Sequence, residues 1–293
     1  MRFTLLVAAG IAVATAAHAG TPQRVVSAGG STTEIVVALG AGALLVGVDT
    51  TSLYPVAVTK LPNVGYVRQL SAEGLLSLRP DIVLTGSEAG PATALAQARD
   101  AGVEIVTMSE GYTAEAVAAH IETAGRALGR DAEAARLVET FEADIAIVEA
   151  DLARIAEKPR VLFILQTSRG AALVSGTDTA AHAMIELAGG VNAVTEYRGY
   201  KPFSPEAAAL AAPDVILITD QTVGAIGGAN SVLSAAAFAT TPAGRNGRLV
   251  TMDALYLVGF GPRLAHALRD LAVKLHPEHQ FAPLPERPWT TSE

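Results

Sequence analysis

Residues 65–81 (GYVRQLSAEGLLSLRPD) bring a tyrosine, an arginine and a glutamate together in one short stretch. Tyr66 and Arg68 are two positions apart, so in an extended segment their side chains point to the same side. A guanidinium beside a phenol favours the phenolate and lowers its pKa from the usual value of about 10. A tyrosinate is a hard anionic ligand for a ferric ion and one of the few protein ligands of haem iron. We therefore expect Tyr66 to bind a metal with Arg68 as its support; the alternative is a surface loop tyrosine beside an unrelated arginine.

The second half of this stretch predicts a short helix that leads into a strand. Ser71 is suited to cap the helix, and Glu73 falls in its first turn, where a carboxylate interacts favourably with the helix dipole. Residues 82–84 (IVL) follow Pro80 and Asp81 with the apolar pattern of a buried strand. The tyrosine and the arginine thus precede an element of an α/β layer.

The pattern Gly-Tyr-x-Arg-x-Leu-Ser-Ala-Glu-Gly, followed by Leu-x-Pro-Asp and a strand, resembles the periplasmic haem-binding proteins of bacterial haem-uptake ABC transporters. These proteins belong to a larger class that also serves cobalamin and ferric siderophores. The resemblance implies that haem, as the transported ligand, lies in a cleft between two α/β lobes, with Tyr66 as axial ligand and Arg68 supporting it. It also implies delivery to an inner-membrane ABC permease with its ATPase, with an outer-membrane haem receptor as a candidate source.

Further cleft residues are expected in the second half of the chain. Residues 259–263 (GFGPR) also resemble the haem-binding group, and Arg263 is either a propionate ligand or the arginine at the start of a surface helix. The residues before the second Ser-x-Glu motif mirror the position of Tyr66 and Arg68 and are expected to face the same cleft: Tyr197, Arg198 and Tyr200.

Some members of the group add a histidine from the loop after the first strand of the second lobe. Here this loop, 166–170 (QTSRG), has no histidine, and its Arg169 is a candidate cleft residue. The iron is therefore expected to be five-coordinate, or to take water or another side chain as its sixth ligand.

The glutamates of the two Ser-x-Glu motifs have two interpretations. Glu73 and Glu206 each fall in the first turn of a predicted helix, where a carboxylate stabilises the helix end by about 0.3–1 kcal/mol. In the transporter class, a pair of carboxylates in this setting, one on each lobe, docks arginines on the two halves of the permease. The sequence leaves both interpretations open.

The N-terminus and the composition predict an exported protein. Residues 1–19 combine a basic start, an apolar core and an Ala-x-Ala site, which indicates a cleaved signal peptide; an N-terminal anchor is the alternative. The 293 residues include no cysteine, which excludes disulfides, thiolate metal sites and a lipid-modified N-terminal cysteine. We expect a soluble protein of a Gram-negative periplasm. The net charge of −8 and the lack of a basic run argue against nucleic acid as a partner.

The order of expected elements predicts an α/β fold with two pseudo-symmetric lobes, each a parallel-type sheet flanked by helices, joined by one long connector helix. Residues 20–112 form the first lobe, 113–158 the helical connector and 159–280 the second lobe, with 281–293 as an extended, loosely held tail. Within the connector, helical periodicity over 131–157 predicts a rigid rod that limits closure of the lobes. In the first lobe, Ser31 and Glu34 have the spacing of a helix capping box.

Other functions fit the sequence less well. It has no Gly-x-Ser-x-Gly elbow, His-Glu-x-x-His motif or P-loop, so we expect no enzyme, and a secreted hydrolase is a remote alternative. Within the binding class, a ferric siderophore or cobalamin is the main alternative to haem.

Overall fold

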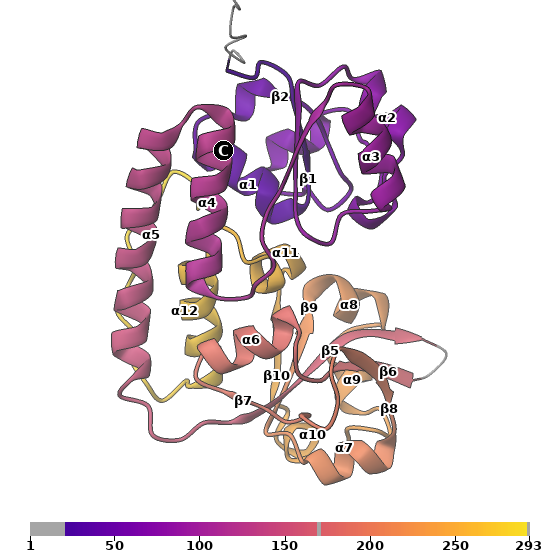
Figure 1. The fold of residues 1–293 in the computed structure, drawn as a ribbon. Coiled ribbons are helices and arrows are strands. Elements are labelled where there is room, and N and C mark those ends of the chain that lie inside the picture. Colours follow the sequence, from indigo (N-terminus) through magenta and orange to yellow (C-terminus); the bar gives the residue numbers. More distant parts are fainter. Residues whose placement is uncertain (1–20, 169–170, 292–293) are drawn as a thin grey trace, which may run out of the picture.

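The computed structural model describes residues 21–168 and 171–291, which form two α/β lobes connected by a layer of long helices (Figure 1). The expected α/β class and two-lobed arrangement are confirmed. The proposed signal peptide lies outside the described residues. Within the described ranges, no helix is both long and apolar enough to cross a membrane.

The first lobe is built on a four-stranded sheet in the order β2-β1-β3-β4, with all strands parallel. Short apolar strands alternate with helices along the chain, so each crossover covers a face of the sheet. The elements are β1 (Val25–Ala28), α1 (Gly30–Ala38), η1 (Gly42–Leu44), β2 (Leu45–Val48), η2 (Val56–Lys60), η3 (Val67–Gln69), α2 (Ala72–Ser77), β3 (Ile82–Thr85), α3 (Ala92–Asp100) and β4 (Glu104–Thr107).

The second lobe has a mixed sheet and not the parallel one expected. The order β10-β9-β5-β6-β8 has a parallel half, β10-β9-β5, with β7 also pairing β5, and an antiparallel half, β5-β6-β8. Its elements are β5 (Arg160–Ser168), β6 (Ala171–Ser175), α6 (Ala180–Leu187), β7 (Val191–Asn192), β8 (Tyr200–Phe203), α7 (Pro205–Ala211), β9 (Val215–Thr219), α8 (Asp220–Ala225), α9 (Ala229–Leu233), α10 (Pro242–Asn246), β10 (Leu249–Met252), α11 (Ala254–Val258) and α12 (Leu264–Leu275).

The two lobes share a repeated supersecondary unit. In the first lobe, Asp81 Oδ2 accepts the backbone N–H of Arg24 at 2.9 Å; in the second, Asp214 Oδ2 accepts that of Arg160 at 2.9 Å. Arg24, just before β1, donates through Nε to the carbonyl of Arg79, two residues past α2, and Arg160, the first residue of β5, donates through Nε to the carbonyl of Ala211 at the end of α7. These contacts extend the repeat predicted from the Ser-x-Glu and Pro-Asp motifs, and they explain the pseudo-symmetry.

Two long helices span the side of the molecule. α4 (Ala114–Leu128) and α5 (Asp131–Leu152) pack together, α4 against α1 of the first lobe and α5 against α12 near the second (Figure 1). α5 is the predicted connector, although it ends five residues earlier than expected, at Leu152, and measures about 33 Å. One continuous apolar cluster contains side chains from both lobes and from this layer, including Ile35, Phe141, Phe163 and Leu268.

The C-terminal segment 281–291 is extended, as expected, but it is not loosely held. Arg287 forms an ion pair with the buried Asp144 of α5 at 2.6 Å, and Trp289 Nε1 donates to the carbonyl of Pro262 at 3.2 Å. The backbone N–H of Ala282 donates to Asp151 Oδ2 at 2.6 Å. These contacts fasten the tail against α5 and near the start of α12.

Candidate ligand-binding cleft

A cavity of about 820 Å³ lies between the two lobes. On the first lobe it is lined by the start of α1 and by loops that follow η2, β3 and β4. The second lobe contributes the start of α6 and of β8, and the turn between α11 and α12 closes the remaining side. Ligands of α/β sheets bind where the carboxyl ends of parallel strands leave such a crevice.

Tyr66 and Arg68 both line this cavity, as predicted. Gly65 has φ 97°, and the N–H of Thr50 donates to its carbonyl at 2.9 Å, which fixes the turn that presents Tyr66. Tyr66 is extended, with φ −84° and ψ 135°, and its side chain is 42% exposed; Arg68 lies in the 3₁₀ turn η3 rather than in extended backbone. The turn still leaves both side chains facing the cavity.

Three other aromatic side chains also line the cavity. Tyr112 contacts Phe260 with ring centroids 5.3 Å apart and planes at 57°, and Tyr200 completes the set. Burial, and secondarily the charge of Glu88, raises the pKa of Tyr112; burial raises that of Tyr200. Tyr112 was not recognised from the sequence, although its position directly after Gly111 and the strand β4 repeats the Gly-Tyr pattern at Tyr66.

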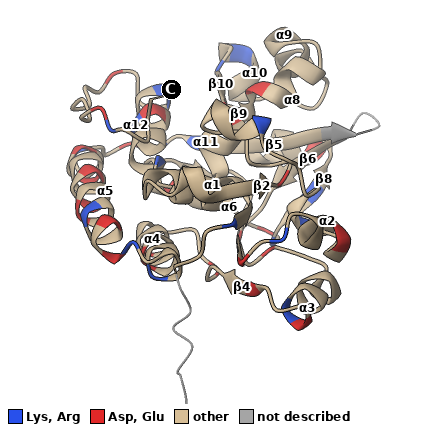
Figure 2. Ribbon diagram, turned by 90° about the horizontal axis from the view of Figure 1, so that it is seen from above, with Lys and Arg blue, Asp and Glu red and all other residues tan. Residues whose placement is uncertain are grey.

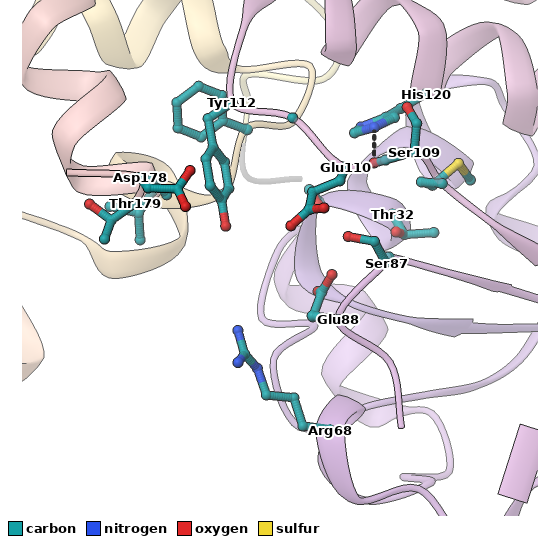
Figure 3. A pocket seen from close by; sticks show the side chains of 18 of the residues that line it. Thr32, Arg68, Ser87, Glu88, Ser109, Glu110, Tyr112, His120, Asp178 and Thr179 are labelled. Atoms are coloured by element: carbon teal, nitrogen blue, oxygen red, sulfur yellow. Dashed lines mark hydrogen bonds between the residues drawn. The ribbon is translucent and has the colours of Figure 1, made fainter. Parts of the chain in front are cut away.

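Polar groups occupy the wall next to the first lobe. His120 Nε2 donates to the carbonyl of Ser109 at 2.8 Å, and burial lowers the pKa of the imidazole (Figure 3). Glu88 and Glu110 lie on the same side (Figure 3). Within the described residues, no group of three or more His, Asp or Glu side chains is arranged to hold a metal ion.

The structure brings only one of the three mirrored residues to the cavity. Tyr200 lines it, whereas the Tyr197 hydroxyl donates to the carbonyl of Val174 at 3.1 Å, and Arg198 pairs with Asp178 at 2.5 Å on the surface. Tyr197 and Arg198 precede the edge strand β8 and are held beside Thr177, whose N–H donates to the Tyr197 carbonyl at 2.8 Å. Arg169 lies outside the described residues.

Arg263 lies outside the cavity, so its placement does not fit the expected propionate ligand. Its guanidinium donates to both carboxylate oxygens of Glu34, Nε to Oε2 at 2.8 Å and Nη2 to Oε1 at 2.6 Å, and lies 3.7 Å from the ring centroid of Tyr54. The side chains of Glu34 and Arg263 are 4% and 12% exposed. Burial raises the pKa of Glu34, and Arg263 opposes this shift.

The capping box predicted at Ser31 and Glu34 is wrong, because Glu34 pairs with Arg263 and no side chain caps the start of α1. α1 begins at Gly30, and its free N–H groups are satisfied from elsewhere: Gly29 N–H donates to Asp49 Oδ1 at 2.9 Å, and Gly30 N–H donates to Thr51 Oγ1 at 3.0 Å. Glu34 is thus free to face α12, and Ser31 lines the cavity.

The two expected docking glutamates occupy equivalent places. Ser71 Oγ accepts the N–H of Gly74 at 2.9 Å and Ser204 Oγ accepts that of Ala207 at 3.2 Å, so both serines cap their helices as predicted. Glu73 and Glu206 are exposed in the first turns of α2 and α7. Hydrogen bonds from its own backbone N–H and from Ser204 hold the pKa of Glu206 below the usual value.

Solved structures similar to this chain include periplasmic heme-binding proteins. BhuT in complex with two hemes is 47% identical to this chain, with a TM-score of 0.84 over 87% of this chain and 98% of BhuT. RhuT from Roseiflexus sp. RS-1, in apo form, is 41% identical, with a TM-score of 0.84 over 88% of this chain and 99% of RhuT.

A curated relative has a matching extent. The uncharacterized ABC transporter substrate-binding lipoprotein YvrC of Bacillus subtilis (strain 168) is 29% identical over 260 residues, which are 88% of this chain and 81% of YvrC. These proteins bind substrates for transport and are not enzymes, in agreement with the absence of catalytic motifs. The model of the family described as periplasmic binding protein matches residues 25–256, and this chain therefore belongs to the periplasmic binding protein family.

Proposed function

We propose that this protein binds haem in the cleft between its lobes and delivers it to an inner-membrane ABC permease. The main support is the pairing of Tyr66 and Arg68 at a cavity of about 820 Å³ with aromatic walls. This arrangement occurs in a chain that is 47% and 41% identical to two heme-binding proteins of the same fold.

Each cleft residue has a distinct part in this proposal. The Tyr66 phenolate binds the ferric iron, and Arg68 stabilises that phenolate. Tyr112, Tyr200 and Phe260 offer ring surfaces for the porphyrin, since aromatic groups pack well in offset or tilted arrangements. The donor set fits ferric haem, because a phenolate supplies an anionic oxygen while the porphyrin supplies the other ligands. Tyr197, Arg198 and Arg263 do not line this cavity and have no direct part in the proposal, and Arg169 lies outside the described residues.

Transfer to the permease is assigned to the two exposed glutamates. Glu73 and Glu206 lie on equivalent helices of the two lobes, each beside a capping serine. We expect them to meet arginines on the two halves of the permease while the cleft faces the membrane. Membership of the periplasmic binding protein family supports a periplasmic location, and an outer-membrane receptor is the candidate source of the haem.

A ligand comparison tests the proposal. The purified apo-protein is titrated by absorption and calorimetry with hemin, cobalamin and a ferric hydroxamate siderophore. Saturable binding of hemin at concentrations where the other two do not bind is expected, because only hemin leaves an iron position open to Tyr66. Preferential binding of cobalamin or of the siderophore would overturn the haem assignment and leave the transport class intact.

A further inference from the structure

We propose that Phe260 is a positioning residue, which acts through Tyr112 by holding the tyrosine ring in place for a porphyrin to pack against. The inference rests on the proposed haem function and deepens it, because it gives the two rings different parts. Tyr112 supplies most of the surface that is open to the ligand, and Phe260 supports that ring from behind.

The two rings differ in how much of each the cavity can reach. Both residues line the cavity, but Tyr112 is 41% exposed and Phe260 only 5%. Their ring centroids lie 5.3 Å apart with the planes at 57°, a tilted arrangement of the kind that aromatic pairs favour. Figure 3 shows the Tyr112 side chain projecting into the cavity. A ligand in the cleft therefore meets Tyr112 first, with Phe260 behind it.

The backbone of Phe260 has a conformation that a bulky residue rarely adopts. Its φ is 51°, in the left-handed region, where a large side chain is unfavourable. Glycine adopts this region without that cost, and glycines stand directly on both sides of Phe260, at 259 and 261. Neither of these glycines has a positive φ. The chain thus keeps a phenylalanine where a glycine would be conformationally easier, which indicates that the position requires the ring.

The turn that carries Phe260 is fixed by its neighbours. Gly261 packs close to α1, since a Cβ atom there would lie 3.4 Å from Ser31 Cβ. Trp289 Nε1 donates to the carbonyl of Pro262 at 3.2 Å, which ties the turn to the C-terminal segment. The Phe260 ring is therefore attached to a part of the backbone that is held from two sides.

Tyr112, by contrast, has little else to direct its ring. Within residues 21–168 and 171–291, its hydroxyl forms no hydrogen bond and its ring contacts no aromatic ring other than Phe260. Burial raises the pKa of Tyr112, so the phenol is uncharged at neutral pH and no ion pair holds it. A ring that is already held in its binding position need not be ordered when the ligand arrives, which favours affinity.

A double-mutant cycle separates support of Tyr112 from direct contact with the ligand. Hemin is titrated by absorption into the wild type, Phe260→Leu, Tyr112→Ala and the double variant. Leucine keeps an apolar side chain at position 260 but removes the ring. We expect Phe260→Leu to lower the affinity for hemin about two- to tenfold, the range that loss of a ring pair implies, and to have almost no effect when Tyr112 is already alanine.

The visible circular dichroism of the bound haem is the second readout, because it depends on how nearby rings lie against the porphyrin. Phe260→Leu should change this signal in the same direction as Tyr112→Ala. Phe238→Leu is the matched control: Phe238 is 3% exposed, lies in an apolar cluster of the second lobe and does not line the cavity. It should keep the wild-type affinity and signal, although it too removes a buried ring.

Equal losses from Phe260→Leu with and without the Tyr112 ring would mean that Phe260 contacts the porphyrin itself, and would overturn the inference. Wild-type affinity in Phe260→Leu, or an equal loss in Phe238→Leu, would overturn it as well. These results leave hemin binding by the wild type, and so the proposed function, intact. Absence of hemin binding by the wild type would overturn the haem assignment and this inference with it.

Discussion

Two tyrosines of the cleft have similar exposure but different neighbours. Tyr66 and Tyr112 are 42% and 41% exposed. Burial and Glu88 raise the pKa of Tyr112, with Arg68 a smaller opposing influence, so this phenol stays protonated through neutral pH. Tyr66 follows the fixed turn at Gly65 with Arg68 two residues on. In the proposed function Tyr66 is therefore the iron ligand, and Tyr112 has a neutral, ring-packing part.

Replacement of Arg68 tests its support of the phenolate. Arg68→Gln should lower the affinity for hemin by about 10- to 100-fold, as removal of groups that support a metal ligand generally does. The fold should be unaffected, because the guanidinium forms no ion pair or hydrogen bond with another described side chain. Absorption titration gives the affinity, and circular dichroism checks the fold. Wild-type affinity in Arg68→Gln would contradict this role.

His120 should make the protein less stable in mild acid. Burial lowers the pKa of His120, so below the unfolded value of about 6.5 the unfolded chain binds more protons than the folded one. The free energy of unfolding should therefore fall as pH decreases from 7.5 to 5, and His120→Gln should lose less over that range. Urea unfolding at each pH measures the free energy of unfolding, and His279→Gln, at an exposed histidine, is the control. Buried His276, whose pKa is also lowered, adds to the same trend. An identical pH profile in His120→Gln and the wild type would refute the contribution of His120.

At the level of elements, α1 and α12 are joined by the buried pair Glu34 and Arg263, 229 residues apart in sequence. Removal of one member leaves an unpaired charge in the interior, which costs about 3–5 kcal/mol, whereas apolar replacement of both is often tolerated. Arg263→Met should therefore be destabilised by about that amount, and the double variant Glu34→Leu/Arg263→Met should recover most of the loss.

The same variants test whether Arg263 binds the ligand. Because its guanidinium lies outside the cavity, the folded double variant should bind hemin with wild-type affinity. Thermal unfolding and hemin titration of both variants are the measurements. A stable double variant that has lost hemin binding would restore Arg263 as a cleft residue.

The elements show which parts of the structure a single sequence can predict. The repeat was predictable because serine caps, first-turn glutamates and Pro-Asp strand starts are local signals, and the same signals located Tyr66. The mixed sheet was not, because residues 200–203 (YKPF) carry no local sign that they pair with β6 rather than form a free loop. Nor does the sequence show that Tyr197 and Arg198 lie beside Thr177 and outside the cavity. The Glu34–Arg263 pair depends on a contact between distant segments, which spacing along the chain does not reveal, whereas the Gly-Tyr pattern at Gly111 and Tyr112 was a local signal.

For the whole molecule, both lobes and the helical layer share one apolar cluster, and the tail is fastened by Arg287 to Asp144. A shared core and a spanning helix favour small rather than large hinge closure. Limited closure thus stays a prediction, now with a physical basis in the packing. Acidic and basic residues are interspersed on the outer helices α3 and α5, with no continuous basic face there (Figure 2).

A rigid frame would also hold the two docking glutamates at a fixed separation. The double charge reversal Glu73→Arg/Glu206→Arg should bind hemin normally, since neither residue lines the cavity. It should raise by about tenfold or more the concentration needed to stimulate the ATPase of the reconstituted permease, because complementary charges guide such encounters. The surface variant Glu139→Arg/Glu142→Arg is the control. Equal stimulation by all three proteins would leave Glu73 and Glu206 with only their helix-end role.

The most direct test of the central claim is a hemin titration of the apo-protein alongside Tyr66→Phe and Tyr112→Phe, two variants that each remove one hydroxyl from tyrosines of nearly equal exposure. The wild type and Tyr112→Phe should form a saturable complex with the absorption spectrum of high-spin ferric haem bound by tyrosinate, and Tyr66→Phe should lose that spectrum. Retention of the spectrum in Tyr66→Phe, or its loss in Tyr112→Phe alone, would contradict the assignment of Tyr66 as the iron ligand.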